Sequence, residues 1–191
     1  MDWNSAQQEA VKQARDLVAR GPLYLDTETT GLGTRSEIIE ISIIDDHGAV
    51  RFDSLVRPRD RIELDAIRIH GITQEMVSDA PLWNEVWPPI ETILDGKLVG
   101  IYNRDFDLRL MKQSHQRYWM PWRVQEENFF CIMRLYARFR GDWDTRRGDY
   151  RWHSLEAAGR QSRIQLPNSH RATDDARLAR ELLHFMAGFS S

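Results

Sequence analysis

A short apolar segment at residues 23–32 carries two acidic residues, and it constrains the fold more than any other part of the chain. It reads Leu-Tyr-Leu-Asp-Thr-Glu-Thr-Thr-Gly-Leu, which predicts a strand that ends at Gly31. Side chains alternate along a strand, so Asp26 and Glu28 share one face, about 7 Å apart. Two carboxylates at this spacing suit a metal ion. An Asp-x-Glu triplet arises by chance about once in a chain of this length, so its meaning depends on partners elsewhere.

Length and composition narrow the protein class. The chain has 191 residues, 41% of them hydrophobic and 29% charged, as expected for one α/β domain of an ordinary globular protein. It contains no apolar run of membrane-spanning length and no signal-peptide pattern, so we expect a cytoplasmic protein without membrane contact. The single cysteine, Cys131, excludes an internal disulfide and a Cys-rich zinc site. A bound metal would therefore have oxygen and imidazole ligands.

The net charge of −3 gives no overall electrostatic case for nucleic-acid binding. Residues 134–151 are locally different, because six arginines alternate there with Tyr136, Phe139, Trp143 and Tyr150. Such a mixture suits a phosphate backbone and stacked bases. It also fits a solvated helix face followed by a loop, and the sequence leaves both interpretations open.

Hydrophobic periodicity divides the remaining chain into strands and helices. Further strands are expected at residues 37–44, 50–56 and 97–102. Glu40 lies inside the first of these, and a buried carboxylate needs a partner, so we favour a structural ion pair for it over a role at the site. Helices are expected at residues 4–19, 82–94, 105–116, 152–159 and 172–186.

The connecting segments are less regular. Pro88 and Pro89 predict a kink or a break in the helix that contains them. Residues 129–139 fit a strand or a helix, and we favour a helix. Residues 64–77 predict a loop with short helical pieces, and residues 141–151 predict a charged loop. Strands followed by alternating helices and strands indicate an α/β sandwich around a mixed sheet.

Two of the predicted helices turn one of two nearby acids toward the core. In the closing helix Asp175 falls within the apolar stripe, whereas Asp174 falls on the polar side. In the helix after the fourth strand, Asp107 lies on the apolar side and Asp105 faces outward. The helix dipole explains one such buried acid. Two of them, beside a strand-borne Asp-x-Glu motif, favour a shared cation, and carboxylate ligands suit Mg²⁺ or Mn²⁺.

A histidine stands close to the last of these acids. His170 precedes Asp175 by five residues and lies just ahead of the closing helix. A lone histidine is usually structural. One held by a loop beside a metal cluster can act as a general base, and we predict this role for His170.

Three motifs in this order resemble a known family. They are Asp26-x-Glu28 followed by Thr-Thr-Gly-Leu, then Asn103-x-x-Phe106-Asp107, and then His170-x-Ala172-x-x-Asp175-Ala176. This pattern resembles the exonuclease motifs of the DEDDh branch of the DnaQ-like 3′–5′ exonucleases, which includes the polymerase epsilon proofreading subunit, ribonuclease T and the TREX enzymes. The resemblance extends over about residues 23–186. It departs at Tyr102-Asn103-Arg104, where the family often has His-Asn-Ala, and at Cys131-Ile132, where many members have Asp-Thr or Asp-Ser.

The resemblance implies a fold and a reaction. The fold would be ribonuclease H-like, a mixed five-stranded sheet with helices on both faces, formed by residues 21–191 after an N-terminal helical extension at residues 1–20. The reaction would be hydrolysis of DNA from single-stranded or frayed 3′ ends, which releases nucleoside 5′-monophosphates. Two Mg²⁺ or Mn²⁺ ions would support it. The metal ligands would be Asp26, Glu28, Asp107 and Asp175, with His170 as the general base.

The resemblance also implies where the substrate lies. Leu32 would act as a wedge against the last base, and backbone amides around Thr29 and Thr30 would hold its sugar and phosphate. The loop Ile69-His70-Gly71-Ile72-Thr73 stands where the family has a similar loop. His70 and Ile72 would therefore contact the terminal nucleotide, although Ile72 fits the core equally well. Asn103 completes the predicted substrate contacts.

Several alternatives stay open at this stage. The same chemistry would serve an exoribonuclease, because the motifs do not report on the sugar. A non-catalytic subunit of a polymerase or nuclease complex would be expected to have lost an acid or the histidine. An endonuclease with a ribonuclease H-like core would lack the histidine before the last aspartate. The sequence leaves open a protein partner or a homodimer.

Overall fold

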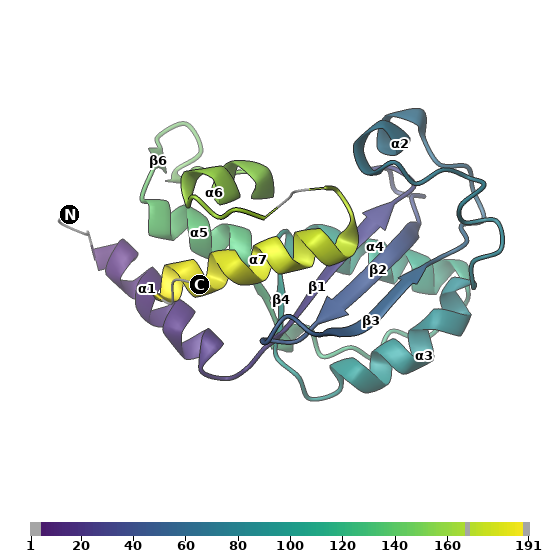
Figure 1. Ribbon diagram of the computed structural model, residues 1–191, viewed down its shortest axis with the longest axis horizontal. Coiled ribbons are helices and arrows are strands. Elements are labelled where there is room, and N and C mark those ends of the chain that lie inside the picture. Colours follow the sequence, from purple (N-terminus) through teal and green to yellow (C-terminus); the bar gives the residue numbers. More distant parts are fainter. Residues whose placement is uncertain (1–4, 167–168, 189–191) are drawn as a thin grey trace.

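Five strands form one mixed sheet in the computed structural model, which describes residues 5–166 and 169–188. The order across the sheet is β3-β2-β1-β4-β5 (Figure 1). β2 runs antiparallel to β1 and β3, whereas β4 runs parallel to β1 and β5 parallel to β4. The strands are β1 (Leu23–Thr29), β2 (Ile38–Ile44), β3 (Val50–Leu55), β4 (Val99–Ile101) and β5 (Phe129–Cys131).

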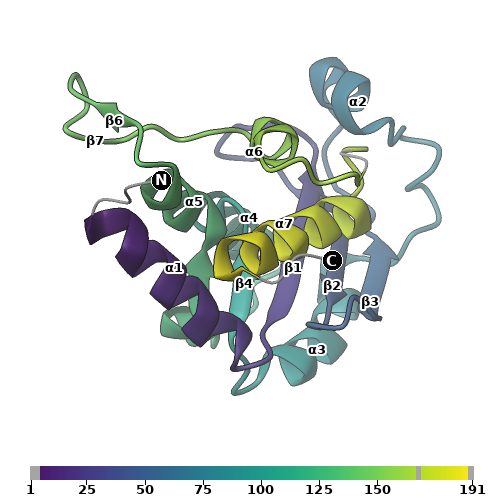
Figure 2. The same cartoon turned by 60° about the vertical axis from the view of Figure 1, so that its left-hand side comes forward.

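Helices cover both faces of this sheet. The first face packs against α1, α5, α6 and α7 through Tyr24 and Ile44, and the second packs against α3 and α4 through Leu25 and Ile43 (Figures 1 and 2). The predicted fold class, a ribonuclease H-like mixed five-stranded sheet with helices on both faces, is therefore confirmed. The helices are α1 (Ser5–Val18), α2 (Leu64–His70), α3 (Trp83–Leu94), α4 (Arg104–Arg117), α5 (Ile132–Arg140), α6 (Leu155–Gln161) and α7 (Ala172–Ala187), with a 3₁₀ turn at Glu126–Asn128.

The first helix is part of the core. α1 lies along α5 and α7, and its inward residues Ala10, Ala14, Leu17 and Val18 are buried (Figure 2). Two alanines at this contact let the helices approach closely. Residue 4, where the sequence predicted the helix to begin, lies outside the described residues. Across the part of the chain that the structure describes, no helix has both the length and the apolar character needed to cross a membrane.

Three local predictions were wrong in detail. Residues 129–139, predicted as one helix, form β5 and then α5, because the first three residues pair with β4. The predicted charged loop at residues 141–151 contains a hairpin of β6 (Trp143–Asp144) and β7 (Asp149–Tyr150). The break that was one of the two outcomes predicted for Pro88 and Pro89 does not occur, because α3 is one continuous helix. The carbonyls left without donors belong to the exposed residues Asn84 and Glu85, which water can satisfy.

Candidate active site

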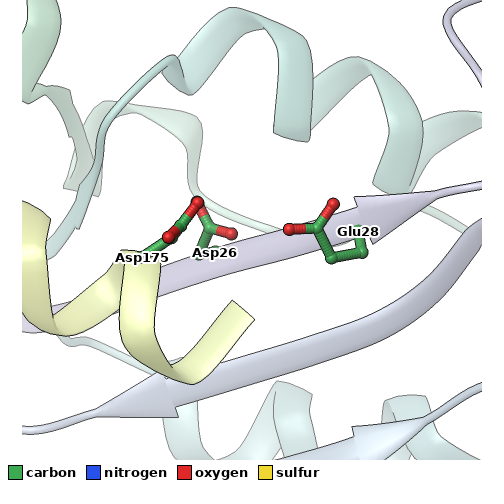
Figure 3. A group of neighbouring side chains, drawn as sticks. All are labelled: Asp26, Glu28 and Asp175. Carbon is green, nitrogen blue, oxygen red and sulfur yellow. The ribbon is translucent and has the colours of Figure 1, made fainter. Parts of the chain in front are cut away.

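Three carboxylates converge above the middle of β1. Asp26 and Glu28 lie on the same face of β1 as Tyr24, the face that α7 covers, and Asp175 reaches them from the first turns of α7 (Figure 3). One oxygen from each of the three lies within 4.8 Å of the others. Oδ1 of Asp175 is buried and has no hydrogen-bond partner. An orphaned oxygen in a group of hard oxygen ligands is the arrangement that a divalent cation would satisfy.

The protonation of this cluster reflects its crowding. Burial, followed by the negative charges of Asp107 and Glu28, raises the pKa of Asp26 well above its usual value. Burial and the charge of Asp175 raise the pKa of Glu28 to about 9. Burial and the neighbouring Asp174 raise the pKa of Asp175 to about 7. Positive charge at the centre of the cluster would stabilise the ionised form of all these groups.

The fourth predicted ligand comes from α4, whose first turn follows the end of β4 beside β1. Asp107 lies in the first turn of α4, is buried, and accepts a hydrogen bond of 2.8 Å from the Thr27 hydroxyl. Its oxygens fall outside the group of three, although its charge acts on Asp26. Burial raises the pKa of Asp107 to about 7, against the opposing effect of the Thr27 hydrogen bond. Thr27 is a residue that sequence reasoning missed, although its position between the two strand acids marks it.

The helical phasing of the acids is confirmed. Asp107 and Asp175 are buried, whereas Asp105 is exposed and pairs with Arg134 at 2.6 Å. Asp174 is only partly buried and accepts a hydrogen bond from Ser169. Each helix therefore turns one of its two acids toward β1.

His170 lies at the rim of the carboxylate cluster. Its Nδ1 is 3.9 Å from Oδ2 of Asp175, and its side chain is about half-exposed. Its backbone has a φ of 51°, in the left-handed region that non-glycine residues rarely adopt. A residue in this conformation persists only when its surroundings hold it there. The next residue, Arg171, is bound to Glu40, and this contact restrains the backbone at His170.

Beside the cluster, Arg171 forms an ion pair with the buried Glu40. The Arg171 guanidinium contacts both carboxylate oxygens of Glu40, and the Ala172 amide donates to the same carboxylate at 2.9 Å. Glu40 is 3% exposed and lies directly across from Glu28 in the pairing of β1 with β2. The predicted structural partner of Glu40 therefore exists. The pair ties the start of α7, and with it His170, to the strand next to the acids.

Replacing Arg171 by alanine should destabilise the protein by about 2–3 kcal/mol, somewhat less than for a fully buried pair because Arg171 is 43% exposed. The loss leaves the Glu40 carboxylate buried without a cation. The matched control is Arg177→Ala, which removes an equally exposed arginine from the partly exposed Asp174 and should cost less than about 1 kcal/mol. Urea unfolding measures both values, and equal losses would contradict the proposed importance of pairing the buried Glu40.

Two of the predicted substrate residues are accessible. Leu32, at the tip of the turn after β1, is 76% exposed. Asn103, the residue before α4, is exposed, and its side chain caps no backbone amide of that helix. Thr29 is buried, and its hydroxyl donates to the Gly31 carbonyl at 2.8 Å. Leu32 and Asn103 are therefore the side chains of this group that a substrate can reach.

Three predicted substrate contacts need correction. The Thr30 amide donates to the Glu37 carbonyl at 2.8 Å, so it is not available to a phosphate. Ile72 is fully buried in a cluster with Ile39, Ile62 and Val77, and belongs to the core.

His70 is also enclosed, at 5% exposure. Its Nδ1 accepts from the Ile72 amide at 3.0 Å, which leaves Nε2 as the donor to the Thr29 carbonyl. Burial lowers the pKa of His70, in agreement with this neutral form. His70 therefore supports the end of β1 from behind instead of stacking on a base.

The raised pKa values predict how the metal-free protein responds to pH. A carboxyl whose pKa is higher in the folded state contributes stability that is complete below its unfolded pKa, near 4, and is lost as pH rises through the folded pKa. With pKa values of about 7 for Asp107 and Asp175 and about 9 for Glu28, the Tm in EDTA should fall between pH 5 and pH 9. Excess Mg²⁺ should restore it most at the alkaline end.

Thermal melts at several pH values, with EDTA and with Mg²⁺, test this expectation. The Glu28→Gln variant should show a shallower decline in EDTA, because one of the repelling carboxylates is gone. A Tm in EDTA that rises across this pH range would contradict the assigned direction.

Comparisons with known proteins identify the family. The RNase_T model, described as an exonuclease, matches residues 23–183. The chain is 35% identical over 170 residues to the uncharacterised exonuclease CP81 of Escherichia phage 186, covering 86% of this chain and 87% of that protein. It is 34% identical over 105 residues to the DNA polymerase III epsilon subunit of Pasteurella multocida, covering 50% of this chain and 42% of that subunit.

A solved structure shows the same relationship. Exonuclease X, in complex with 5′ overhanging duplex DNA, superposes with a TM-score of 0.60 at 27% identity, covering 88% of this chain and 93% of that chain. Exonucleases of this family use divalent metal ions, and the carboxylates around Asp26 fit such ions. The chain therefore belongs to the RNase_T exonuclease family and is a DnaQ-like nuclease with a ribonuclease H-like fold.

Proposed function

We propose that the protein is a 3′–5′ exonuclease that removes nucleotides from single-stranded or frayed 3′ ends of DNA and releases nucleoside 5′-monophosphates. The observation that carries this proposal is the convergence of Asp26, Glu28 and Asp175 with His170 at their rim. A buried acid cluster with a half-exposed histidine beside it combines cation binding with proton exchange to solvent. The exonuclease domain would comprise residues 21–191, with an N-terminal extension at residues 1–20 whose helix α1 packs into the same core.

The carboxylates would hold two divalent cations, Mg²⁺ or Mn²⁺. Asp26, Glu28 and Asp175 would bind one, while Asp26 and Asp107 would bind the other. When bound, these ions supply a lowered pKa for the attacking water and stabilisation of the negative charge on the departing 3′ oxygen. Thr27 keeps the Asp107 side chain turned toward β1 through its hydrogen bond.

His170 would accept the proton of the attacking water. A neutral imidazole is the suitable acceptor near pH 7. The ion pair of Arg171 with Glu40 holds the adjacent backbone, so the imidazole stays close to Asp175. Its partial exposure lets the accepted proton pass on to solvent. The water oxygen forms a bond to phosphorus while the bond from phosphorus to the 3′ oxygen of the preceding nucleotide breaks. That 3′ oxygen takes up a proton from solvent, and the phosphate stays on the 5′ carbon of the released nucleotide.

The terminal nucleotide would lie between two exposed groups. Leu32 projects beyond the end of β1 and suits an apolar wedge against the last base. Asn103 directly precedes α4, the helix that carries Asp107, and its side-chain amide can meet the sugar or phosphate there. DNA is favoured because Exonuclease X, which is similar over most of this chain, was solved with DNA.

Hydrolysis of a 5′-labelled single-stranded DNA with Mg²⁺ tests the proposal. A ladder of stepwise shorter labelled products, with unlabelled nucleoside 5′-monophosphates, is expected. Release of the label as a mononucleotide at the outset would overturn the polarity. Faster turnover of a matched RNA strand would reassign the substrate, and cleavage of a circular single strand would indicate an endonuclease. The variants Asp105→Ala and Asp174→Ala, which remove the outward-facing acids, should keep most of the activity. A large loss of activity in either variant would contradict the assignment of the inward acids to the site.

A further inference from the structure

We propose that residues 142–152, called here the arm, bind a single-stranded nucleic acid on the 5′ side of the nucleotide being removed. This inference rests on the proposed nuclease function and adds a second contact with the same strand. The arm contains the hairpin of β6 and β7 and the segment that leads toward α6. None of its residues belongs to the carboxylate cluster.

The arm presents aromatic rings to solvent from a defined backbone. Trp143 pairs with Tyr150 across the hairpin, and their rings meet edge to face at 5.2 Å between centroids. Trp143 is nevertheless 56% exposed, and Trp152, just beyond β7, is 44% exposed. Two large exposed rings on one short segment contribute little to the core and mark a binding surface. Their faces suit unpaired nucleobases.

The charges of the arm are arranged so that its arginines stay available. Asp144 and Asp149 each accept a hydrogen bond from a backbone amide of the hairpin, and Asp142 lies 3.6 Å from Arg140 and from His153. In contrast, three exposed arginines of the arm have no ion pair among the described residues: Arg146, Arg147 and Arg151. The acids stabilise the hairpin while these cations face solvent. Unpaired guanidinium groups beside exposed rings match the repeating phosphate and base of a single strand.

The base of the arm is fastened next to the active site. The Tyr102 hydroxyl donates to the His153 carbonyl at 2.8 Å. The Arg134 guanidinium lies over the Trp152 ring and also pairs with Asp105 at 2.6 Å. Tyr102 and Asp105 are on either side of Asn103, at the start of the helix that carries Asp107. Figure 2 shows the hairpin projecting from the side of the molecule formed by α5 and α6, so a strand held near Asn103 can continue over the base of the arm toward the hairpin.

A single strand fits this surface better than a duplex or a protein. In a duplex the base faces are stacked and hidden, so exposed tryptophans would find no partner there. Tryptophan and arginine also occur at protein interfaces, but a protein would have to supply a matching acid for each of the three unpaired arginines, whereas a nucleic-acid strand carries a phosphate at every nucleotide. The arm alternates rings and arginines. Its occupant is therefore the upstream part of the strand whose 3′ end enters the site.

Binding measurements on the full chain in EDTA test this assignment. Arg146→Ala/Arg147→Ala should weaken the binding of a fluorescently labelled single-stranded oligonucleotide by about tenfold, and should reduce the slope of log K against log salt by about 1.4. The matched control is Arg20→Ala/Lys97→Ala, which removes two exposed cations where β1 and β4 begin. This control should leave both the affinity and the salt slope close to those of the wild-type protein. Trp143→Ala should also weaken binding, whereas Trp119→Ala, at an exposed tryptophan after α4, should not.

Kinetics on substrates of two lengths give an independent readout. On a long oligonucleotide the arm variants should raise KM and leave kcat unchanged. On a dinucleotide, which is too short to reach the arm, they should match the wild-type protein. Wild-type affinity and salt slope in the arm variants would overturn the proposal and leave the arm to a protein partner. Failure of the wild-type protein to hydrolyse any strand would refute the nuclease function alone, since the binding experiment still decides the role of the arm.

Discussion

Replacing Asp26 by asparagine should lower kcat/KM for DNA hydrolysis by at least about a thousandfold and raise the Tm of the metal-free protein. The size of the kinetic loss is that of removing one strong electrostatic stabiliser from a site. Asp26 is close to Glu28 and Asp175, and the charge of Asp107 also acts on it. It is the one residue proposed to bind both cations. Its loss should therefore be the most damaging single change in the chain.

The gain in stability has the same physical origin. Burial and the neighbouring negative charges raise the pKa of Asp26, so its ionised form opposes folding when no cation is present. An amide of the same shape removes that repulsion. Rates with Mg²⁺ and melting curves in EDTA at pH 8 give the two measurements. Asp16→Asn is the control, because this exposed acid of α1 belongs neither to the carboxylate cluster nor to the base of the arm and should change neither value much.

Opposite changes in rate and stability separate a functional acid from a structural one. An Asp26→Asn variant that melts at a lower temperature in EDTA would show that the carboxylate stabilises the fold. A variant with activity within tenfold of the wild-type protein would remove Asp26 from the site. Either result would contradict the proposed metal centre.

Replacing His170 by glutamine should reduce kcat by about 10²- to 10⁴-fold, the range for losing a general base, with little change in KM. His170 is half-exposed at the rim of the cluster, and its imidazole is a long 3.9 Å from the Asp175 carboxylate. Its removal should therefore leave the free energy of unfolding nearly unchanged. Single-turnover rates, KM and urea unfolding measure the three quantities.

A second histidine supplies the control for this substitution. His47 lies exposed in the turn between β2 and β3, far from the carboxylates along the strand, and His47→Gln should keep wild-type kinetics. A His170→Gln variant with a raised KM and an unchanged kcat would instead indicate a substrate contact. A large loss of stability would assign His170 a structural role.

Periodicity along the sequence predicted the parts of the site that depend on local geometry. A two-residue repeat placed Asp26 and Glu28 on one face of β1, and a 3.6-residue repeat turned Asp107 and Asp175 inward. These predictions hold because the apolar neighbours of each acid decide which face of a strand or helix is buried. The same reasoning assigned Glu40 to a buried strand and to a structural ion pair.

Short elements escaped this reasoning because pairing with distant strands creates them. β5 exists because Phe129–Cys131 lies beside β4, where a side chain at Gly100 would come within 2.7 Å of the Phe130 ring. The two strands of the hairpin in the arm have two residues each, too few to show any period. Local sequence alone cannot reveal such contacts.

The sequence by itself determined which acids this protein turns toward its core, the order of the motifs and hence the exonuclease family. Only the tertiary structure decided which groups meet. The hydrogen bond of Thr27 with Asp107 and the ion pair of Arg171 with Glu40 join residues 80 and 131 positions apart. The tertiary structure also placed Ile72 in the core and bonded the Thr30 amide to the Glu37 carbonyl. The physical reason is that strand and helix periods fix the direction of a side chain, whereas the packing of α4 and α7 against β1 fixes what that side chain encounters.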